Sequence, residues 1–395
     1  MTGTDEASGV AWSVPDDRAL ICFPFTGGLV GGSHISALKL IQNLDRSRFE
    51  PLIVLHDDKG PVRDFLNEHQ VPFEPAPCPM YMAPGDMLGR QAIRTPGAIL
   101  TLARFLRRRR VRIVHTNDGP MHVTWGLAAR LAGVPQLWHH RGNPGARGAR
   151  FVAPWTAARM VAVSKYAAPS KGKFGLGPAC GIVHSPFDPA AAAIDKTAAR
   201  RRALEQLQVS DDTVLLGLFG HFSDRKRPLV FVDMVAALRK RWPDRQILGL
   251  MFGKEFEPGL EGRIGDRIAE LGLGGVVRKM GFCAPAEPWI AACDALVVTA
   301  VEEPFGRTLI EAMLVRTPVI AAASGGNCEA IRHMETGLLV QPDNSDAFAA
   351  AVATLLGDGA AAAAIASRAH EEAMTKFGIR CHVEAIEATY RDLLT

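Results

Sequence analysis

One stretch, residues 295–343, restricts the possible folds of this chain more than any other. Its apolar runs at 295–298 and 318–323 predict buried strands, and residues 308–315 between them predict a helix. A glycine-bearing loop follows each of the two strands. Strands that alternate with helices favour a parallel sheet, in which ligands bind at the loops beyond the carboxyl ends of the strands.

The start of this helix suits a phosphate group. Free backbone N–H groups and a partial positive charge gather at a helix N-terminus. Two carboxylates, Glu303 and Glu311, stand on either side of the helix start. Carboxylates repel phosphate but accept hydrogen bonds from hydroxyl groups, so the pattern fits a diphosphate between two hydroxyl-bearing rings, as in a nucleoside diphosphate sugar. The alternative is structural: Thr308 and Glu311 also fit a capping box, with Glu303 a solvated loop residue.

The short motifs in this stretch occur in a characteristic order. They are E-P-F-G, I-E-A-M, P-V-I-A, G-G-x-x-E and T-G-L-L-V. This order resembles the E-x7-E signature of the retaining glycosyltransferases of family 4. The resemblance implies the GT-B fold, in which two Rossmann-like doubly wound α/β domains face each other across a cleft. It also implies an enzyme, a hexosyltransferase that moves a sugar from a nucleoside diphosphate sugar with retention of configuration.

The same resemblance assigns roles to individual residues. Glu303 would hold hydroxyl groups of the donor sugar and act at the catalytic centre, and Glu311 would hold the ribose hydroxyls. The backbone amides that face the diphosphate would be those of Gly306, Arg307, Thr308 and Leu309. The donor base, UDP or GDP, stays open at this point.

A second glycine-rich loop lies near the start of the chain. The apolar run at 19–23 predicts a strand, and Ser33 is placed to cap the helix that follows the loop. The glycine spacing fits neither common nucleotide-binding pattern, so a plain tight turn is an equal alternative. In the family that the chain resembles, a loop of this kind sits beneath the donor phosphates and near the acceptor. That position falls on Gly31 and Gly32.

The alternation of strands and helices divides the chain into two domains. Residues 1–188 predict a Rossmann-like domain on the acceptor side, and residues 189–375 predict a second one that binds the nucleotide sugar. The link between them is expected at 186–189, where the composition changes. The last segment, 376–395, has helical apolar spacing, and the resemblance implies that this helix packs back on the first domain.

The loop after the strand at 214–219 carries further phosphate-binding candidates. Family 4 enzymes typically show G-R-L-x-x-x-K-G at this place, and Lys226 falls on the lysine. Lysine binds phosphate well as a point charge. His221 occupies the position of the arginine, which is a departure from the pattern. Either His221 makes a weaker contact, or Arg225 or Arg227 supplies the missing charge.

The W-H-H-R segment ends the strand predicted at 136–140. Side chains alternate along a strand, so His139 and Arg141 share a face and His140 points away. Family members often carry a histidine or arginine here, close to the reacting carbon of the donor. Either His139 or Arg141 could orient the sugar or stabilise the departing phosphate. The alternative for His139 is a core histidine.

The overall composition excludes several classes of protein. Lys and Arg number 45 and Asp and Glu 41, a net charge of +4 that is too small to imply nucleic acid. The 7 cysteines form no C-x-x-C pair, which argues for a reducing compartment and against zinc. The N-terminal segment is polar, and no apolar run reaches the ~20 residues that span a bilayer. We therefore expect a cytoplasmic protein.

No D-x-D motif is present to hold a divalent metal between phosphates. We therefore expect no cofactor and no metal, with Lys226 and helix N-termini neutralising the leaving group.

Six arginines fall in the nine residues from Arg104 to Arg112. They fit a solvated helix end, a peripheral contact with the inner face of an anionic membrane that carries a lipid-linked acceptor, or an anionic glycan. The residues alone do not choose among these.

Three other functions compete with glycosyl transfer to a glycan or lipid-linked acceptor in polysaccharide or glycolipid biosynthesis. A sugar-nucleotide epimerase would need paired acid and base carboxylates, which the sequence does not show. A nicotinamide dehydrogenase could use Asp57 at a strand end, but the glycine spacing is wrong. A non-catalytic sugar-nucleotide-binding protein fits the departure at His221.

Overall fold

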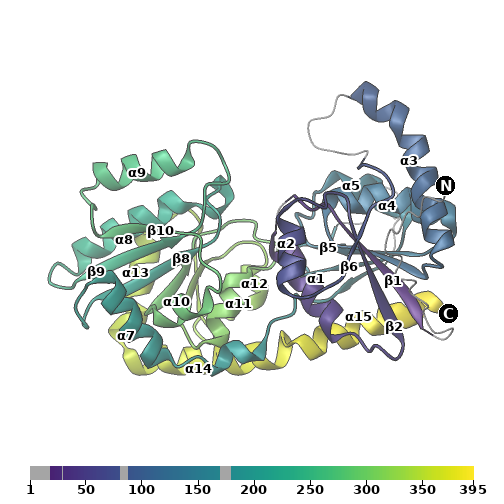
Figure 1. Ribbon diagram of the computed structural model, residues 1–395. Coiled ribbons are helices and arrows are strands. Elements are labelled where there is room, and N and C mark those ends of the chain that lie inside the picture. The colour runs from purple at the N-terminus through teal and green to yellow at the C-terminus, as the bar shows by residue number, and fades with distance from the viewer. Residues whose placement is uncertain (1–17, 29, 81–87, 170–178) are drawn as a thin grey trace, which may run out of the picture.

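The computed structural model describes residues 18–28, 30–80, 88–169 and 179–395. Two α/β halves stand side by side in it, each built on a parallel sheet (Figure 1). Residues 1–17, the polar N-terminal segment from which a cytoplasmic protein is expected, lie outside the described residues.

The N-terminal half is a seven-stranded sheet in the order β3-β2-β1-β4-β5-β6-β7, and every neighbouring pair is parallel. Its strands are β1 (Ala19–Phe25), β2 (Phe49–Leu55), β3 (Glu74–Pro75), β4 (Ile113–Thr116), β5 (Gln136–His140), β6 (Ala157–Ala162) and β7 (Cys180–Ile182). The helices are α1 (Gly32–Asn43), α2 (Pro61–Glu68), α3 (Leu88–Arg108), α4 (Gly119–Ala132), α5 (Arg147–Phe151) and α6 (Ala153–Thr156).

The C-terminal half is a six-stranded parallel sheet in the order β10-β9-β8-β11-β12-β13. Its strands are β8 (Val214–Phe219), β9 (Ile247–Phe252), β10 (Val277–Gly281), β11 (Ala295–Val298), β12 (Val319–Ala322) and β13 (Leu338–Val340). The helices before β11 are η1 (Pro189–Ala193), α7 (Lys196–Leu207), η2 (Asp224–Lys226), α8 (Pro228–Arg241), α9 (Leu260–Glu270) and α10 (Glu287–Ala292). Those after it are α11 (Arg307–Leu314), α12 (Asn327–Ala330), α13 (Ser345–Gly357), α14 (Gly359–Lys376) and α15 (Ile379–Leu394).

Both sheets reverse their strand order at one place. In the first sheet the reversal lies between β1 and β4, and in the second it lies between β8 and β11. Loops at such a switch point diverge to opposite faces of the sheet and leave a crevice where ligands bind. The four loops that follow these strands are therefore the ones expected to form a site.

The helix caps differ from the sequence-based expectations. The capping box of Thr308 and Glu311 is wrong, because α11 begins at Arg307 and its N-cap is Gly306. Gly306 has φ +73°, a left-handed conformation that glycine adopts without strain. Ser33 is likewise inside the first turn of α1, whose N-cap is Gly31.

The segment that follows β5 forms a helix that its sequence does not predict. Its glycine-rich composition gives no helical signal, yet residues 147–151 form α5. Gly148 lies against the Trp138 ring, where an added Cβ would stand 3.4 Å from that ring. Packing on a large aromatic surface outweighs the low helix propensity of glycine here.

Helices α14 and α15 run along the base of both halves in Figure 1, so the chain crosses twice between them. The two crossings lie side by side, since the Phe187 amide donates to the Phe377 carbonyl at 3.0 Å. Helix α15 buries Val383, Ile386 and Tyr390 in the core beneath β1 and β2 of the N-terminal sheet. The last helix therefore completes the core of the first half.

No single described helix is long and apolar enough to cross a membrane. Helices α13 and α14 pass the length and composition test only together, and they meet at an angle of 100°.

Replacing Ile386 by alanine tests the contribution of α15 to the fold. Ile386 is 0% exposed, so Ile386→Ala should lower the free energy of unfolding by about 2–5 kcal/mol through lost burial and a residual cavity. Urea unfolding monitored by circular dichroism measures the change. Arg391→Ala, at an exposed position of the same helix, is the matched control and should change stability little. Equal stability of the two variants would contradict the packing described for α15.

Candidate functional site between the two halves

A cavity of about 970 Å³ lies between the two halves, at the loops that follow the switch-point strands. Residues from both halves line it. The N-terminal half contributes Gly32, Ser33, Asn117, Asp118, His140, Arg141 and Ser185. The C-terminal half contributes His221, Arg225, Lys226, Glu303, Gly306, Arg307 and Thr308. The carboxyl ends of β1, β4, β8 and β11 thus open into one space.

Glu303 lies at the centre of the C-terminal wall of this cavity. One of its oxygens, Oε2, accepts from Arg225 Nη1 at 2.5 Å and from Lys226 Nζ at 2.8 Å. The loop that carries Glu303 is held by Gly326, whose amide donates to the Glu303 carbonyl at 2.7 Å. An added Cβ on Gly325 would stand only 2.6 Å from that carbonyl oxygen, so this close approach requires glycine.

Two opposing effects set the ionisation of Glu303. Burial raises the pKa of its carboxyl group, but the charges of Lys226 and Arg225 and their hydrogen bonds outweigh burial and lower that pKa overall. The carboxylate is therefore ionised at neutral pH. Because the folded-state pKa is depressed, this ionisation stabilises the fold at neutral pH, and the contribution is lost as the pH falls through that pKa.

Three helices begin at the cavity. Gly32 and Ser33 open α1, Gly119 opens α4, and Arg307 and Thr308 open α11. The positive ends of helices α1 and α11 therefore approach the same space from opposite halves. At the start of α4 the carboxylate of Asp118 offsets the positive end of the helix, because its Oδ1 accepts from the Met121 amide at 3.0 Å and caps the helix.

Arg307 connects the two halves across the cavity. Its Nη1 donates to Ser36 Oγ in α1 at 2.9 Å, and its guanidinium lies 4.6 Å from the centre of the Phe187 ring. Its Cδ is so close to Gly32 that an added Cβ there would stand 2.8 Å away. The side chain of Arg307 therefore fills the space that the missing side chain of Gly32 leaves.

Glu311 lies one turn behind the start of α11 and does not line the cavity. Its Oε1 accepts from Arg307 Nη2 at 3.3 Å, and its side chain is 16% exposed. Burial raises the pKa of Glu311, partly offset by the charge of Arg307. Leu309, one of the predicted amide donors, is fully buried and also absent from the lining.

Arg141 lines the cavity with a guanidinium that is held by neutral partners. Its Nε donates to Asn117 Oδ1 at 3.2 Å, its Nη1 to Ser185 Oγ at 3.3 Å, and its Nη2 to His139 Nδ1 at 3.3 Å. No carboxylate among the described residues forms an ion pair with it. Burial lowers the pKa of Arg141, and the nearby charge of Arg307 lowers it further. A buried cation without a counter-ion is costly, so this site is prepared for an anion.

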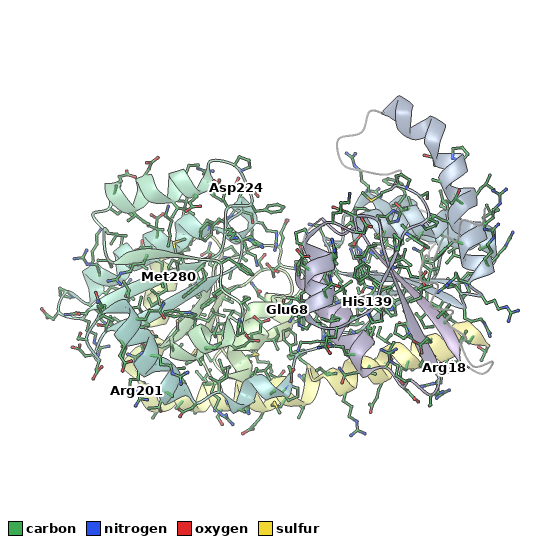
Figure 2. The ribbon with its side chains drawn as sticks, viewed as in Figure 1. Arg18, Glu68, His139, Arg201, Asp224 and Met280 are labelled. Atoms are coloured by element: carbon green, nitrogen blue, oxygen red, sulfur yellow. The ribbon has the colours of Figure 1, made fainter. Side chains whose placement is uncertain are left out.

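His139 lies behind Arg141 and does not line the cavity. It is 0% exposed, and Figure 2 shows it inside the N-terminal half. His139 and Arg141 share a side of the strand as the alternation predicts, but only Arg141 reaches the open space. His140, expected to point away from the site, does line the cavity next to Trp138, and its Nε2 donates to the Asn143 carbonyl at 3.0 Å.

His221 and one of the two arginines considered beside it, Arg225, lie at the cavity. His221 lines the cavity and stacks on the Phe282 ring, with ring centres 6.1 Å apart. Arg225 also lines it, beside Lys226 and Glu303. Arg227 turns away and pairs with Asp343 at 2.8 Å. Arg225 therefore brings a positive charge to the same wall of the cavity in which His221 lies.

Sequence reasoning missed Asn117 and Ser185, two of the three neutral partners of Arg141. Both lie in loops that follow strands, Asn117 after β4 and Ser185 after β7, which is a usable signal, but neither belongs to a motif. Of the two predicted glycines, Gly32 lines the cavity and Gly31 stands behind it as the N-cap of α1. Within residues 18–28, 30–80, 88–169 and 179–395, no three His, Cys, Asp or Glu side chains are grouped as metal ligands.

Two family models match the chain, one in each half. Residues 31–168 match the Glycosyl transferase 4-like domain, and residues 213–358 match Glycosyl transferases group 1. The matched segments contain Arg141 in the first half and Lys226 and Glu303 in the second.

Curated proteins similar to this chain include glycosyltransferases of two kinds. A D-inositol 3-phosphate glycosyltransferase of Corynebacterium glutamicum is 31% identical over 201 residues, which cover 50% of this chain and 47% of the relative. The lipopolysaccharide core biosynthesis glycosyltransferase LpsE of Rhizobium meliloti is 28% identical over 189 residues, covering 48% of this chain and 52% of the relative. The chain thus matches about half the length of these relatives.

Solved structures resemble the chain over nearly its whole length. Anabaena HepE in complex with UDP and glucose has a TM-score of 0.79 at 24% identity, covering 94% of this chain and 99% of that one. Sucrose-phosphate synthase of Thermosynechococcus elongatus has a TM-score of 0.73 at 19% identity, covering 95% and 99%. These similarities confirm the predicted fold class of two facing Rossmann-like domains. The chain therefore has the GT-B fold, and its first half matches the Glycosyl transferase 4-like domain while its second half matches Glycosyl transferases group 1.

Proposed function

We propose that this protein is a retaining glycosyltransferase that moves a sugar from a nucleoside diphosphate sugar to a glycan or lipid-linked acceptor. The observation that carries the proposal is the charge distribution of the cavity. Arg141 enters it without a carboxylate partner, and Arg225 and Lys226 enter from the opposite half. The starts of α1 and α11 add positive ends of helices. A diphosphate between the halves satisfies all of these groups.

In this proposal the cations stabilise the leaving group. Negative charge develops on the nucleoside diphosphate as the bond to the sugar breaks, and fixed positive groups in a water-poor site stabilise that charge. Lys226, Arg225 and Arg141 supply such groups. When the diphosphate takes over Lys226 and Arg225, Glu303 is released from its ion pairs and becomes free to accept hydrogen bonds from the donor sugar.

The donor is proposed to be a UDP- or GDP-sugar. Anabaena HepE, the structural neighbour described above, has been crystallised with UDP-glucose as well, and that structure has a TM-score of 0.80. The curated relatives act in lipopolysaccharide core synthesis or on D-inositol 3-phosphate by name. These likenesses favour a hexose donor and a polar, hydroxyl-rich acceptor.

The acceptor side is proposed to lie against an anionic surface, with the protein in the cytoplasm. Of the six arginines from Arg104 to Arg112, two have internal partners: Arg107 donates to the Leu131 carbonyl, and Arg109 pairs with Glu74. The remainder, Arg104, Arg108, Arg110 and Arg112, are exposed. Such a cluster fits the peripheral membrane contact better than a plain helix end.

Cosedimentation of the protein with vesicles that contain anionic lipid tests this contact, and Arg108→Gln and Arg112→Gln are expected to weaken binding to the vesicles.

The donor assignment is tested with a panel of UDP-, GDP- and ADP-sugars, read out as slow hydrolysis and as transfer to added acceptors. We expect turnover of at least one UDP- or GDP-sugar.

Activity should survive excess EDTA, because helix ends, Arg225 and Lys226 neutralise the leaving group and a chelator removes none of them. Loss of activity that manganese or magnesium restores would contradict the metal-free mechanism. Binding of a sugar nucleotide without any turnover would instead favour the non-catalytic binding protein.

Glu311→Ala tests the proposed ribose contact. Loss of the carboxylate should weaken UDP or GDP binding by about 1–3 kcal/mol, because the ribose hydroxyls lose an acceptor. Inorganic pyrophosphate, which has no ribose, is the matched ligand and should bind the variant at least as well as the wild-type protein. Isothermal titration calorimetry measures both affinities. A folded variant that binds nucleotide normally would remove Glu311 from the proposed site.

Glu303→Gln separates phosphate binding from transfer. The substitution removes a negative charge 2.5 Å from Arg225 and 2.8 Å from Lys226, so pyrophosphate affinity should rise about three- to tenfold. Sugar transfer should fall, because the amide is a poorer acceptor for the donor hydroxyls. Glu302→Gln, at the exposed neighbouring position, is the matched control. If Glu303→Gln weakened pyrophosphate binding, Lys226 and Arg225 would not be the phosphate ligands.

A further inference from the structure

A chain of buried hydrogen bonds runs from the last helix to Arg141. Tyr390 Oη, on α15, lies 2.5 Å from His115 Nδ1. His115 Nε2 lies 3.2 Å from His139 Nδ1, and Arg141 Nη2 lies 3.3 Å from the same nitrogen. Tyr390, His115 and His139 are each 0% exposed. This series of hydrogen bonds therefore connects the C-terminal helix with the cavity entirely through the core.

The positions of the protons in this series of hydrogen bonds follow from the chemistry of the guanidinium group at one end of it. A guanidinium can only donate, so His139 Nδ1 must be the acceptor and must carry no proton. His115 Nε2 faces that same acceptor and must therefore donate. Burial lowers the pKa of both histidines well below its ordinary value, so each ring is neutral and carries one proton. His115 Nδ1 is then unprotonated and accepts from the Tyr390 hydroxyl.

We propose that Tyr390 is a positioning residue for Arg141, acting through the tautomers of His115 and His139. Its hydroxyl donates to His115 Nδ1 and so keeps the ring proton of His115 on Nε2. That proton points at His139 Nδ1 and keeps the lone pair of His139 available to Arg141. The proposal rests on the anion-binding role given to Arg141 in the proposed function.

Without the hydroxyl the opposite arrangement becomes accessible. His115 could carry its proton on Nδ1 and present the lone pair of Nε2 to His139. His139 would then donate from Nδ1, and this N–H would face the N–H of Arg141 Nη2. Two donors facing each other repel, so Arg141 would lose one of its three neutral partners and turn away from Asn117 and Ser185.

In the part of the chain that the structure describes, no carboxylate forms an ion pair with Arg141 that could take over this task. His382 of α15 stacks on His139, with ring centres 5.6 Å apart, but its Nδ1 donates to the His184 carbonyl at 2.6 Å. The charged neighbour of Arg141 on the C-terminal side is Arg307, which repels it. Among the described residues, the orientation of Arg141 therefore depends on neutral hydrogen-bond partners.

The first test reads the ring nitrogens directly. Nitrogen-15 NMR of the full-length protein, labelled in histidine rings, should show His115 and His139 protonated at Nε2 and bare at Nδ1. His115→Gln and His139→Gln assign the two signals. Tyr390→Phe should shift one or both rings toward the Nδ1-protonated form, whereas Tyr166→Phe, the matched control, should not. A protonated Nδ1 on His139 in the wild-type protein, or unchanged rings in Tyr390→Phe, would overturn the proposal.

The second test measures the consequence for Arg141 with inorganic pyrophosphate as the probe. Tyr390→Phe should weaken pyrophosphate binding about three- to tenfold, as expected for the loss of one ordinary hydrogen bond. Adding His115→Gln should restore part of the affinity, because a glutamine amide donates from the Nε2 position without needing a tautomer. No recovery in a double variant with an unchanged melting temperature would mean that Tyr390 acts only through packing. The NMR test needs no ligand, so it can fail while the proposed function stands.

Discussion

The cleft depends on the charge of Arg141. Its guanidinium is buried at the end of β5 and is held by an asparagine, a serine and a histidine. A carboxylate partner would neutralise the group and leave it unable to attract an anion, whereas neutral partners orient it and keep its charge available. Across the cavity the arrangement is the reverse, since Arg225 and Lys226 share the carboxylate of Glu303. One half thus offers a free cation, and the other offers cations that a ligand must take from Glu303.

Much of the fold could be predicted because its strands are apolar runs of ordinary length. Three of them, at 136–140, 214–219 and 295–298, have the predicted bounds. The C-terminal wall of the site was also predictable, since Glu303, Gly306 and Lys226 follow one another in motifs with fixed spacing. The sequence could not predict which residues of the N-terminal wall reach the cavity and which are buried behind it. Alternation shows that His139 and Arg141 share a face, but α15, about 240 residues later in the chain, determines which of them is covered.

Arg307 shows why a motif can hide a structural role. The motif suggested only its backbone amide, yet its side chain bridges Glu311 in one half and Ser36 in the other. That bridge is possible because Gly32 has no side chain at the place where Arg307 passes. The two glycines singled out in the first loop therefore differ in purpose: Gly31 caps a helix, and Gly32 makes room for a residue of the other domain.

The position of α15 has a consequence for how the chain folds during synthesis. The core beneath β1 and β2 contains Val383, Ile386 and Tyr390, which are synthesised after the strands of both sheets. The N-terminal domain, whose strands are synthesised first, therefore keeps an apolar face uncovered until α15 has been synthesised. The C-terminal domain has its strands and the helices that cover them by residue 376, so it can complete its core earlier. The order in which the two domains complete their cores is thus the reverse of the order in which their strands are synthesised, and the first domain depends for its core on a helix that follows every strand of the second.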